Sequence, residues 1–322
     1  MPAEVVVRGA NPRQVGLLFC RVLHMLDSTR PVLRPRIAPA GLMFLAVTSI
    51  GWGFNWPVTK FLLGELPPLT LRGVTGVLGA VLLAALALVR GDSLKVAPGI
   101  WPRLVTAAIL NVTGWMVLMG LALLWLPASE AALIAYTMPV WASIIAWPVL
   151  GERPTVVRTL GLVMAFAGLA AIMGGNGIAA SAEKAPGIIM ALCGALGFAV
   201  GTVFSKKYPI HLPPITAAAW QIGIGCLPIS IIGLIIETTH LELVTPVGWL
   251  LLVYSTVVQF CIAYVSWFAA LARLPASVAA IGTMAVPVIG VVASAMALHE
   301  PLGAGQIAAL IFTLAAVVLA TR

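Results

Sequence analysis

Long apolar runs separated by short polar segments occupy most of the chain, from about residue 41 to residue 320. Each run is near the ~20 residues that an α-helix needs to cross about 30 Å of hydrocarbon. Because backbone N–H and C=O groups find no water in hydrocarbon, each run should be helical. The pattern predicts ten transmembrane helices, at residues 41–61, 69–90, 103–124, 128–149, 156–174, 186–206, 214–236, 248–271, 276–297 and 303–320.

The second half of the chain repeats the first at a nearly constant offset. Residues 126–133 read LPASEAAL, and residues 274–281 read LPASVAAI, 148 positions later. The other matches are Pro139 with Pro287 and Glu152 with Glu300, at the same offset, and Leu66–Thr70 (LPPLT) with Leu212–Thr216 (LPPIT), at an offset of 146. Two homologous halves in an apolar chain are typical of secondary transporters. We therefore expect one five-helix repeat in residues 40–175 and a second in residues 185–321.

Lys and Arg are unevenly divided between the two sides of this topology. With the N-terminus in the cytoplasm, fifteen lie inside and three outside, the three being Lys60, Arg72 and Lys184. This positive-inside pattern predicts a multi-pass membrane protein with both termini cytoplasmic. Five helices per half is an odd number, so the second repeat should enter the membrane from the opposite side and be inverted. The net charge of +8 then belongs to cytoplasmic loops and does not indicate a nucleic-acid partner.

The composition excludes an ordinary soluble enzyme. The apolar fraction is 61%, the charged fraction is 9% and the mean hydropathy is +1.09, whereas a soluble domain carries about 25% charged residues. Four cysteines without CxxC spacing are interpreted as small packing residues: Cys20, Cys193, Cys226 and Cys261. We expect no disulfide framework, no metal site and no cofactor.

Residues 1–39 lie outside the repeat and hold six arginines. Their apolar stretch, residues 15–26, is too short to cross a bilayer. We interpret the segment as a basic cytoplasmic tail, either an interfacial helix or disordered. An over-long start is a further interpretation, with translation beginning near Met25 or Met43. No cleavage signal follows the apolar stretch, so a signal peptide is not expected.

Three motifs, in order along the chain, resemble those of one transporter family. Residues 52–60, WGFNWPVTK, resemble the WGxNxxxxK signature in the first helix of EamA-type members of the drug/metabolite transporter superfamily. Residues 137–153 resemble the TPxxxxxxxxxxxxGER pattern that closes the fourth helix, and residues 298–301, LHEP, resemble its weaker second copy. The resemblance covers about residues 40–320. It implies a ten-helix inner-membrane carrier that exports amino acids or related small metabolites.

Two positions depart from the family pattern. Met138 separates Thr137 from Pro139, so the TP pair is split. Arg72 falls near a position where the family often has an arginine in the second helix, but Gly73 replaces its usual aromatic neighbour. The substrate is not implied by the resemblance, since family members differ widely.

Prolines within predicted spans mark candidate hinges. A proline lacks the N–H that would bond the carbonyl four residues earlier, which kinks a helix or frees that carbonyl. The kink either acts as a hinge near a central cavity or is a static packing feature, and both interpretations stay open. The candidates are Pro57, Pro139 and Pro287.

Ionisable residues inside or near the spans are few, and each is a candidate by default. Arg72 begins the second span, Glu130 begins the fourth and Lys60 ends the first. Glu130 and Arg72 are predicted to pair with each other, to bind the carboxylate and ammonium of an amino acid, to carry a proton, or to lie solvated at the interface. Glu152 and Glu300 follow one helix and precede the next, where a carboxylate offsets a helix dipole.

Polar and aromatic residues within the spans predict a substrate cavity with aromatic walls and a few amides. The alternative is that the aromatic residues form interfacial belts and the amides join helices. The candidates, besides Arg72 and Glu130, are Asn55, Trp56, Asn111, Trp115, Tyr136, Trp220, Gln221, Gln259 and Tyr264.

The function predicted from these features is secondary transport of small metabolites by alternating access, with export as the expected direction. Coupling to a proton and facilitated diffusion both stay open as the energy source. Broad-specificity drug or nucleoside export is the alternative, followed by a non-transport scaffold or sensor. An enzyme is not expected, because the chain has no HExxH, GxSxG or Walker A motif and its four histidines fall in the tail or loops. The partners expected are a small molecule and the lipid bilayer, in a monomer or homodimer.

Overall fold

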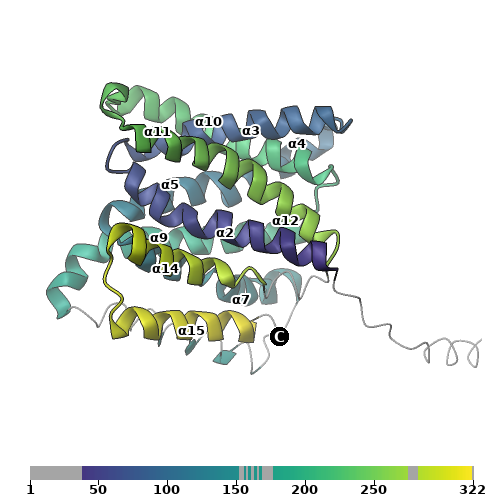
Figure 1. The fold of residues 1–322 in the computed structure, drawn as a ribbon. Helices are drawn as coiled ribbons and strands as arrows, with labels where there is room; N and C mark the ends of the chain where they lie inside the picture. Colours follow the sequence, from purple (N-terminus) through teal and green to yellow (C-terminus); the bar gives the residue numbers. More distant parts are fainter. Residues whose placement is uncertain are drawn as a thin grey trace, which may run out of the picture. The chain divides into compact units, whose positions relative to one another are not determined.

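The computed structural model describes residues 38–151, 177–274 and 282–320, with isolated positions at 156, 159–160, 163–164 and 167–168. Every regular element in these residues is helical (Figure 1). In the first half they are α2 (Pro39–Leu62), α3 (Pro68–Val89), η1 (Pro98–Ile100), α4 (Trp101–Ala108), η2 (Ile109–Thr113), α5 (Gly114–Trp125), α6 (Ala128–Ala135) and α7 (Met138–Leu150). In the second half they are α9 (Gly177–Lys207), α10 (Pro214–Ile236), η3 (Leu241–Leu243), α11 (Pro246–Val253), η4 (Tyr254–Ile262), α12 (Ala263–Leu271), α14 (Ala285–Leu298) and α15 (Ala304–Ala320).

Six helical segments of the described residues are long and apolar enough to cross a membrane, and α14 and part of α15 are shorter apolar helices. The six are Pro68–Val89, Pro98–Trp125, Ala128–Leu150, Ala182–Lys207, Pro214–Ile236 and Pro246–Leu271. Helical membrane spans are thus confirmed as the fold class, while the number ten stays a prediction. Most of the predicted fifth span, the start of the ninth, and the basic tail lie outside the described residues.

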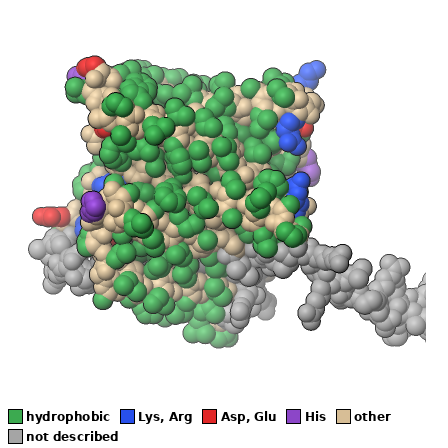
Figure 2. Space-filling model, viewed as in Figure 1, with side chains coloured by type: hydrophobic (Ala, Val, Ile, Leu, Met, Phe, Trp, Pro, Cys, Tyr) green, Lys and Arg blue, Asp and Glu red, His purple; other side chains and the backbone are tan. Residues whose placement is uncertain are grey.

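The surface of the bundle suits lipid. Large apolar side chains such as Val81, Ile235, Leu250 and Met296 are more than half exposed, an arrangement that soluble monomers avoid. Figure 2 shows hydrophobic side chains over the middle of the visible face, with Lys and Arg gathered at the edge where α2 begins in Figure 1. The apolar belt and the charged edge indicate a multi-pass membrane protein.

The packing of the helices repeats between the two halves. The second helices of the halves, α3 and α10, run side by side (Figure 1). The first helix of the first half, α2, packs against α12 and α14 of the second. The first helix of the second half, α9, packs against the corresponding elements α5, α6 and α7 of the first. Each half therefore completes the other, as the sequence repeat leads one to expect.

Glycines allow α3 and α10 to touch at the backbone. A Cβ added to Gly73 would overlap the Cα and N of Ser230, and one added to Gly233 would lie 2.6 Å from the N of Thr70. Close backbone approach through small residues is how apolar helices gain packing energy in lipid, where burial itself drives little association. Gly73, a departure from the family pattern in sequence, is thus a packing requirement of this interface.

The predicted fourth span is not one continuous helix. It divides into α6 and α7 at Tyr136–Thr137. Pro139 therefore does not kink a helix from inside but occupies the first turn of α7, where its missing N–H leaves no bond unmade. Pro287 lies likewise in the first turn of α14, and the Thr283 carbonyl that it was expected to free accepts a hydrogen bond from the Val286 N–H. Of the three hinge candidates, Pro57 alone is internal to a continuous helix, α2.

Carboxylates from one half cap helices of the other. Glu237, just after α10, accepts hydrogen bonds from the N–H groups of Leu69 and Thr70 in α3. Glu65, before α3, accepts from the Thr245 N–H and hydroxyl at the start of α11. Each carboxylate satisfies helix N–H groups that have no partner within their own helix and offsets the helix dipole.

Glu300 makes the third cap of this kind. It accepts from the N–H groups of Ala128 and Ser129 and from the Ser129 hydroxyl, at the start of α6. The sequence predicted a capping carboxylate here but assigned it to the next helix along the chain; its target is instead in the other half. Its repeat partner, Glu152, lies outside the described residues.

Glu130, at the start of α6, is paired within the protein. Its side chain is 1% exposed, and its two oxygens lie 2.8 and 3.0 Å from the Lys184 Nζ in α9. Gln306 of α15 also donates to it, at 3.4 Å. Of the alternatives for Glu130, the ion pair with Arg72 is therefore wrong, and so is a solvated position at the interface.

Replacing Gly73 by alanine is expected to destabilise the protein, because the new methyl group meets the Ser230 backbone, which cannot rotate away. Overpacking of this kind costs roughly 1–3 kcal/mol. The matched control is Gly197→Ala in α9, where a Cβ would meet nothing within 4 Å and the change should be neutral or stabilise by up to about 1 kcal/mol. Thermal unfolding of purified protein in detergent measures both, and equal melting temperatures for the two variants would contradict this interface.

Replacing Lys184 by methionine is expected to lower the melting temperature, because it leaves the buried Glu130 carboxylate without a cation. Breaking a buried pair costs about 3–5 kcal/mol, and the low end applies because the Lys184 side chain is 22% exposed. The double variant Glu130→Gln, Lys184→Met should recover most of the loss, since no charge is then left alone. Equal stability of the Lys184→Met variant and the unaltered protein would show that the pair contributes nothing.

Candidate functional site

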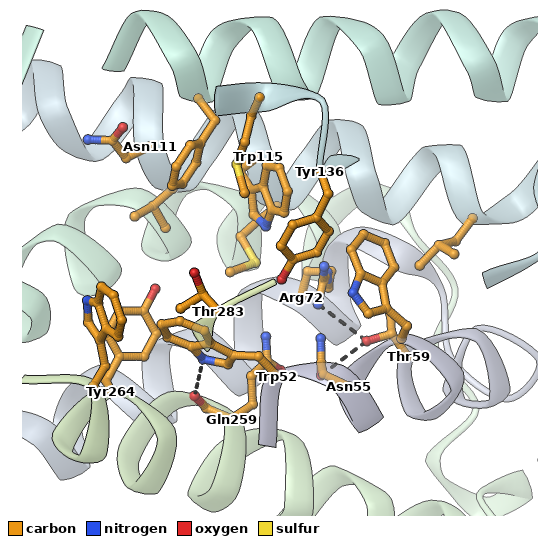
Figure 3. Close-up of a pocket in the computed structure, with 17 residues that line it drawn as sticks. Trp52, Asn55, Thr59, Arg72, Asn111, Trp115, Tyr136, Gln259, Tyr264 and Thr283 are labelled. Atoms are coloured by element: carbon orange, nitrogen blue, oxygen red, sulfur yellow. Dashed lines mark hydrogen bonds between the residues drawn. The ribbon is translucent and has the colours of Figure 1, made fainter. Parts of the chain in front are cut away.

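A cavity of about 300 Å³ lies between the two halves, within the size range of small-molecule sites (Figure 3). Its walls come from α2, α3, η2, α5, the α6–α7 break and α7 in the first half, and from α9, η4, α12 and the turn before α14 in the second. It is lined by Trp52, Asn55, Trp56, Thr59, Arg72, Asn111, Val112, Trp115, Met116, Leu123, Tyr136, Met138, Phe198, Gln259, Tyr264, Trp267 and Thr283.

Aromatic rings form much of the wall and hold one another in place. Trp52 packs edge-to-face on Tyr264 with ring centroids 5.4 Å apart, and Trp267 is tilted against Trp52 at 6.0 Å. On another part of the wall, Trp115 and Phe198 lie 5.1 Å apart. Such contacts fix ring orientation and are worth about 0.5–1.5 kcal/mol each beyond burial. This part of the cavity wall is thus apolar, and the cavity has a size suited to a ring or a short aliphatic chain.

Irregular backbone brings several lining residues inward. Asn111 lies in the π-helical segment η2, and Gln259 lies in η4, the π-helical segment of the corresponding span in the second half. Tyr136 ends α6 at the break before α7. Extra residues per turn rotate the following side chains relative to an α-helix, which is why π segments are frequent at functional sites.

Arg72 is the one cation among the described residues that line the cavity and is 5% exposed. Its Nη1 donates to the Thr59 hydroxyl at a long 3.4 Å, and Thr59 donates in turn to the Asn55 Oδ1 at 3.4 Å (Figure 3). Its Nε is buried without a hydrogen-bond partner. The described part of the wall contains no carboxylate. Burying a guanidinium inside a membrane protein without a counter-charge is unfavourable, by roughly 3 kcal/mol or more at the bilayer centre.

The amides of the wall are partly engaged. Asn111 donates from its Nδ2 to the Ser205 hydroxyl of α9, and its Oδ1 is buried without a partner in the part of the chain that the structure describes. The backbone carbonyl of Gln259 accepts from the Trp52 indole at 3.4 Å. Asn55 points toward the cavity beside Thr59 in Figure 3. These groups supply neutral donors and acceptors around the aromatic container.

Eight of the eleven candidate site residues predicted from sequence line this cavity: Asn55, Trp56, Arg72, Asn111, Trp115, Tyr136, Gln259 and Tyr264. Three do not: Glu130, Trp220 and Gln221. Trp220 instead donates to the Leu94 carbonyl and packs edge-to-face on Trp101 at 5.2 Å. Glu130 is held by Lys184, which favours a structural role for it. Substrate contact by the eight stays a prediction.

Other lining residues were not singled out from the sequence. Trp52 and Thr59 share a helical face with Asn55 and Trp56, at the i, i+3, i+4, i+7 spacing, and that stripe was available as a signal. Trp267 follows Tyr264 by three positions in α12. Phe198 and Thr283 carried no comparable signal, because nothing distinguishes them from other residues of their spans.

The sequence was compared with known families and proteins. The pattern of the EamA-like transporter family matches twice, over residues 39–174 and 185–322. An uncharacterized transporter of Bacillus subtilis, YvbV, is 31% identical over 281 residues, which cover 86% of this chain and 90% of that protein.

Two relatives have more specific names. A probable amino-acid metabolite efflux pump of Salmonella typhimurium is 26% identical over 85% of this chain and 92% of that protein. An aromatic amino acid exporter of Ancylobacter novellus, YddG, is 26% identical over 70% of this chain and 78% of that protein. The two family matches span most of the sequence and agree with its repeated helix packing. The chain is a multi-pass membrane protein that belongs to the EamA-like transporter family.

Proposed function

We propose that this protein is a secondary transporter that carries amino acids or related small amphipathic metabolites across the bacterial inner membrane, in the direction of export. The observation that carries the proposal is the cavity between the two halves, with aromatic walls, amides and one buried cation. A cavity of this size and composition fits a small amphipathic molecule. Two relatives named for amino-acid efflux support this substrate range.

The mechanism we propose is alternating access of two inverted five-helix repeats, residues 40–175 and 185–321, which together form ten spans. The reciprocal packing of α2 and α9 supports it, because two half-structures of opposite orientation can exchange conformations around one central site. The α6–α7 break and the turn before α14 border the cavity. Pro139 and Pro287 follow these points directly and fix the start of each new helix. We assign the hinges to these two places.

The orientation we propose has the N-terminus in the cytoplasm. The basic residues on described helix ends and loops support it, because six of them belong to ends assigned to the cytoplasmic side: Arg90, Lys95, Arg103, Lys206, Lys207 and Arg273. Lys60 and Lys184 lie at the opposite helix ends. The carboxylate caps made by Glu65, Glu237 and Glu300 then lie on the outer side.

Transport is tested with purified protein in liposomes loaded with an unlabelled aromatic amino acid, with entry of the labelled form followed over time. We expect saturable exchange. Trp115→Leu should reduce the exchange rate by about tenfold or more, because a wall ring is lost from the cavity. The control is Trp249→Leu, since Trp249 is exposed on α11 and lies outside the cavity. Equal loss in both variants would refute this cavity as the transport site.

The orientation predicts which loops an impermeant thiol reagent reaches in intact cells. In a variant lacking the four native cysteines, Glu242→Cys should be labelled from outside, whereas Lys95→Cys should be labelled only after the cells are opened. Both positions are exposed in the structure, so a difference in labelling reports the side of the membrane. The reverse labelling pattern would invert the proposed topology.

A further inference from the structure

Arg72 is a buried guanidinium that the protein itself does not neutralise. Among the described residues its Nη1 donates to the neutral hydroxyl of Thr59, at 3.4 Å, and its Nε has no partner. Guanidinium presents five N–H donors in a fixed plane. Most of this donor capacity is therefore unused, in a side chain that lines the cavity.

Four described carboxylates near helix ends already have partners other than Arg72. Glu237 caps α3, Glu65 caps α11 and Glu300 caps α6. Glu130 is paired with Lys184. No side chain among these can turn to Arg72 without giving up a helix cap or a buried ion pair. None of these four carboxylates is thus left to neutralise Arg72, and a molecule in the cavity can supply the counter-charge.

We propose that the cavity selects small monocarboxylate anions with an apolar, ring-sized body, and that Arg72 holds the carboxylate. The inference rests on the proposed function, in which this cavity binds the transported molecule. A carboxylate matches the planar fork of guanidinium with two parallel hydrogen bonds. A single negative charge neutralises Arg72, whereas a phosphate ester dianion would leave an uncompensated negative charge in the cavity.

The apolar body of the substrate fits the remaining wall, formed by rings such as Trp52, Trp115 and Tyr264. An α-ammonium group has no carboxylate to pair with among the lining residues. It would also bring a second positive charge near Arg72. Recognition therefore does not depend on an amino group, and the preferred substrates are organic acids or amino-acid derivatives that have lost or masked the amine.

The closing experiment measures binding calorimetrically to the full-length protein in lipid nanodiscs. Four probes share one phenyl ring: phenylpropanoate, its neutral amide phenylpropanamide, L-phenylalanine and phenethylamine. We expect phenylpropanoate to bind at least as tightly as phenylalanine. The amide and the amine should each bind at least about tenfold more weakly than phenylpropanoate, since each lacks the charged acceptor. Phenyl phosphate as a fifth probe should bind less tightly than phenylpropanoate.

Two Arg72 variants and one control complete the test. Arg72→Gln should remove the preference for phenylpropanoate over its amide, and Arg72→Lys should keep part of it. The control is Arg90→Gln, an exposed arginine at the end of the same helix α3, which should leave the preference unchanged. The probe series on the unaltered protein decides the question even if an Arg72 variant does not fold.

The results separate this proposal from the proposed function. The selectivity proposal is overturned if the amine or the amide binds as tightly as the acid, if phenylalanine binds more than about tenfold tighter than phenylpropanoate, or if no probe binds. Binding with the expected preference but no exchange in liposomes would refute transport and leave the recognition by Arg72 intact. Exchange of phenylalanine without any preference for a carboxylate would refute the recognition by Arg72 and leave transport intact.

Discussion

Backbone N–H and C=O groups in the hydrocarbon region have no water to bond, and this constraint governs the whole structure. Within a span the helix satisfies them, but every helix begins with N–H groups that it cannot satisfy itself. Here the ends are satisfied across the repeat: Glu237 caps α3, Glu65 caps α11 and Glu300 caps α6. At the other kind of helix end, where carbonyls lack a partner, Lys60 of α2 donates to the Leu123 and Leu126 carbonyls at the end of α5. Because each carboxylate belongs to one half and its target to the other, the groups that complete the helices also join the halves.

The same constraint decides where the cavity lies. Irregular backbone at membrane depth is tolerated only where protein surrounds it or where it lines a cavity. The described irregular points within the spans, η2, η4, the α6–α7 break and the turn before α14, all contribute to the cavity wall. Gln259 in η4 and Tyr136 at the α6–α7 break are two of the polar residues that line the cavity at these points. The repeat doubles each irregularity, so the two halves supply one wall each and the site forms between them.

Sequence reasoning reached much of the fold and part of the site, and its failures share one physical origin. Apolar runs and the repeat predicted helical spans, because both are properties of local sequence and of lipid. Eight cavity residues followed from the rarity of polar and aromatic side chains in those runs. The α6–α7 break was missed because Thr137 and Met138 read as ordinary helix residues; only the packed structure shows where the chain turns. For a related reason Glu300 was assigned to the wrong helix, and the alternatives for Glu130 did not include its partner. Their targets, Ser129 and Lys184, lie 171 and 54 positions away, and no local pattern connects them.

Arg72 and Gly73 show how packing and chemistry depend on each other in α3. Adjacent helical residues point about 100° apart, so when Gly73 faces the Ser230 backbone of α10, Arg72 is turned toward the cavity. On its other side the Arg72 stem meets Gly120 of α5, where a Cβ would come within 3.2 Å of the Arg72 Cγ. Gly120 on the neighbouring helix α5 thus makes room for the Arg72 stem. An aromatic side chain at position 73 would overlap the Ser230 backbone and separate α3 from α10. Gly73 thus sets the close approach of α3 to α10, and Arg72, the preceding residue of the same helix, lines the cavity.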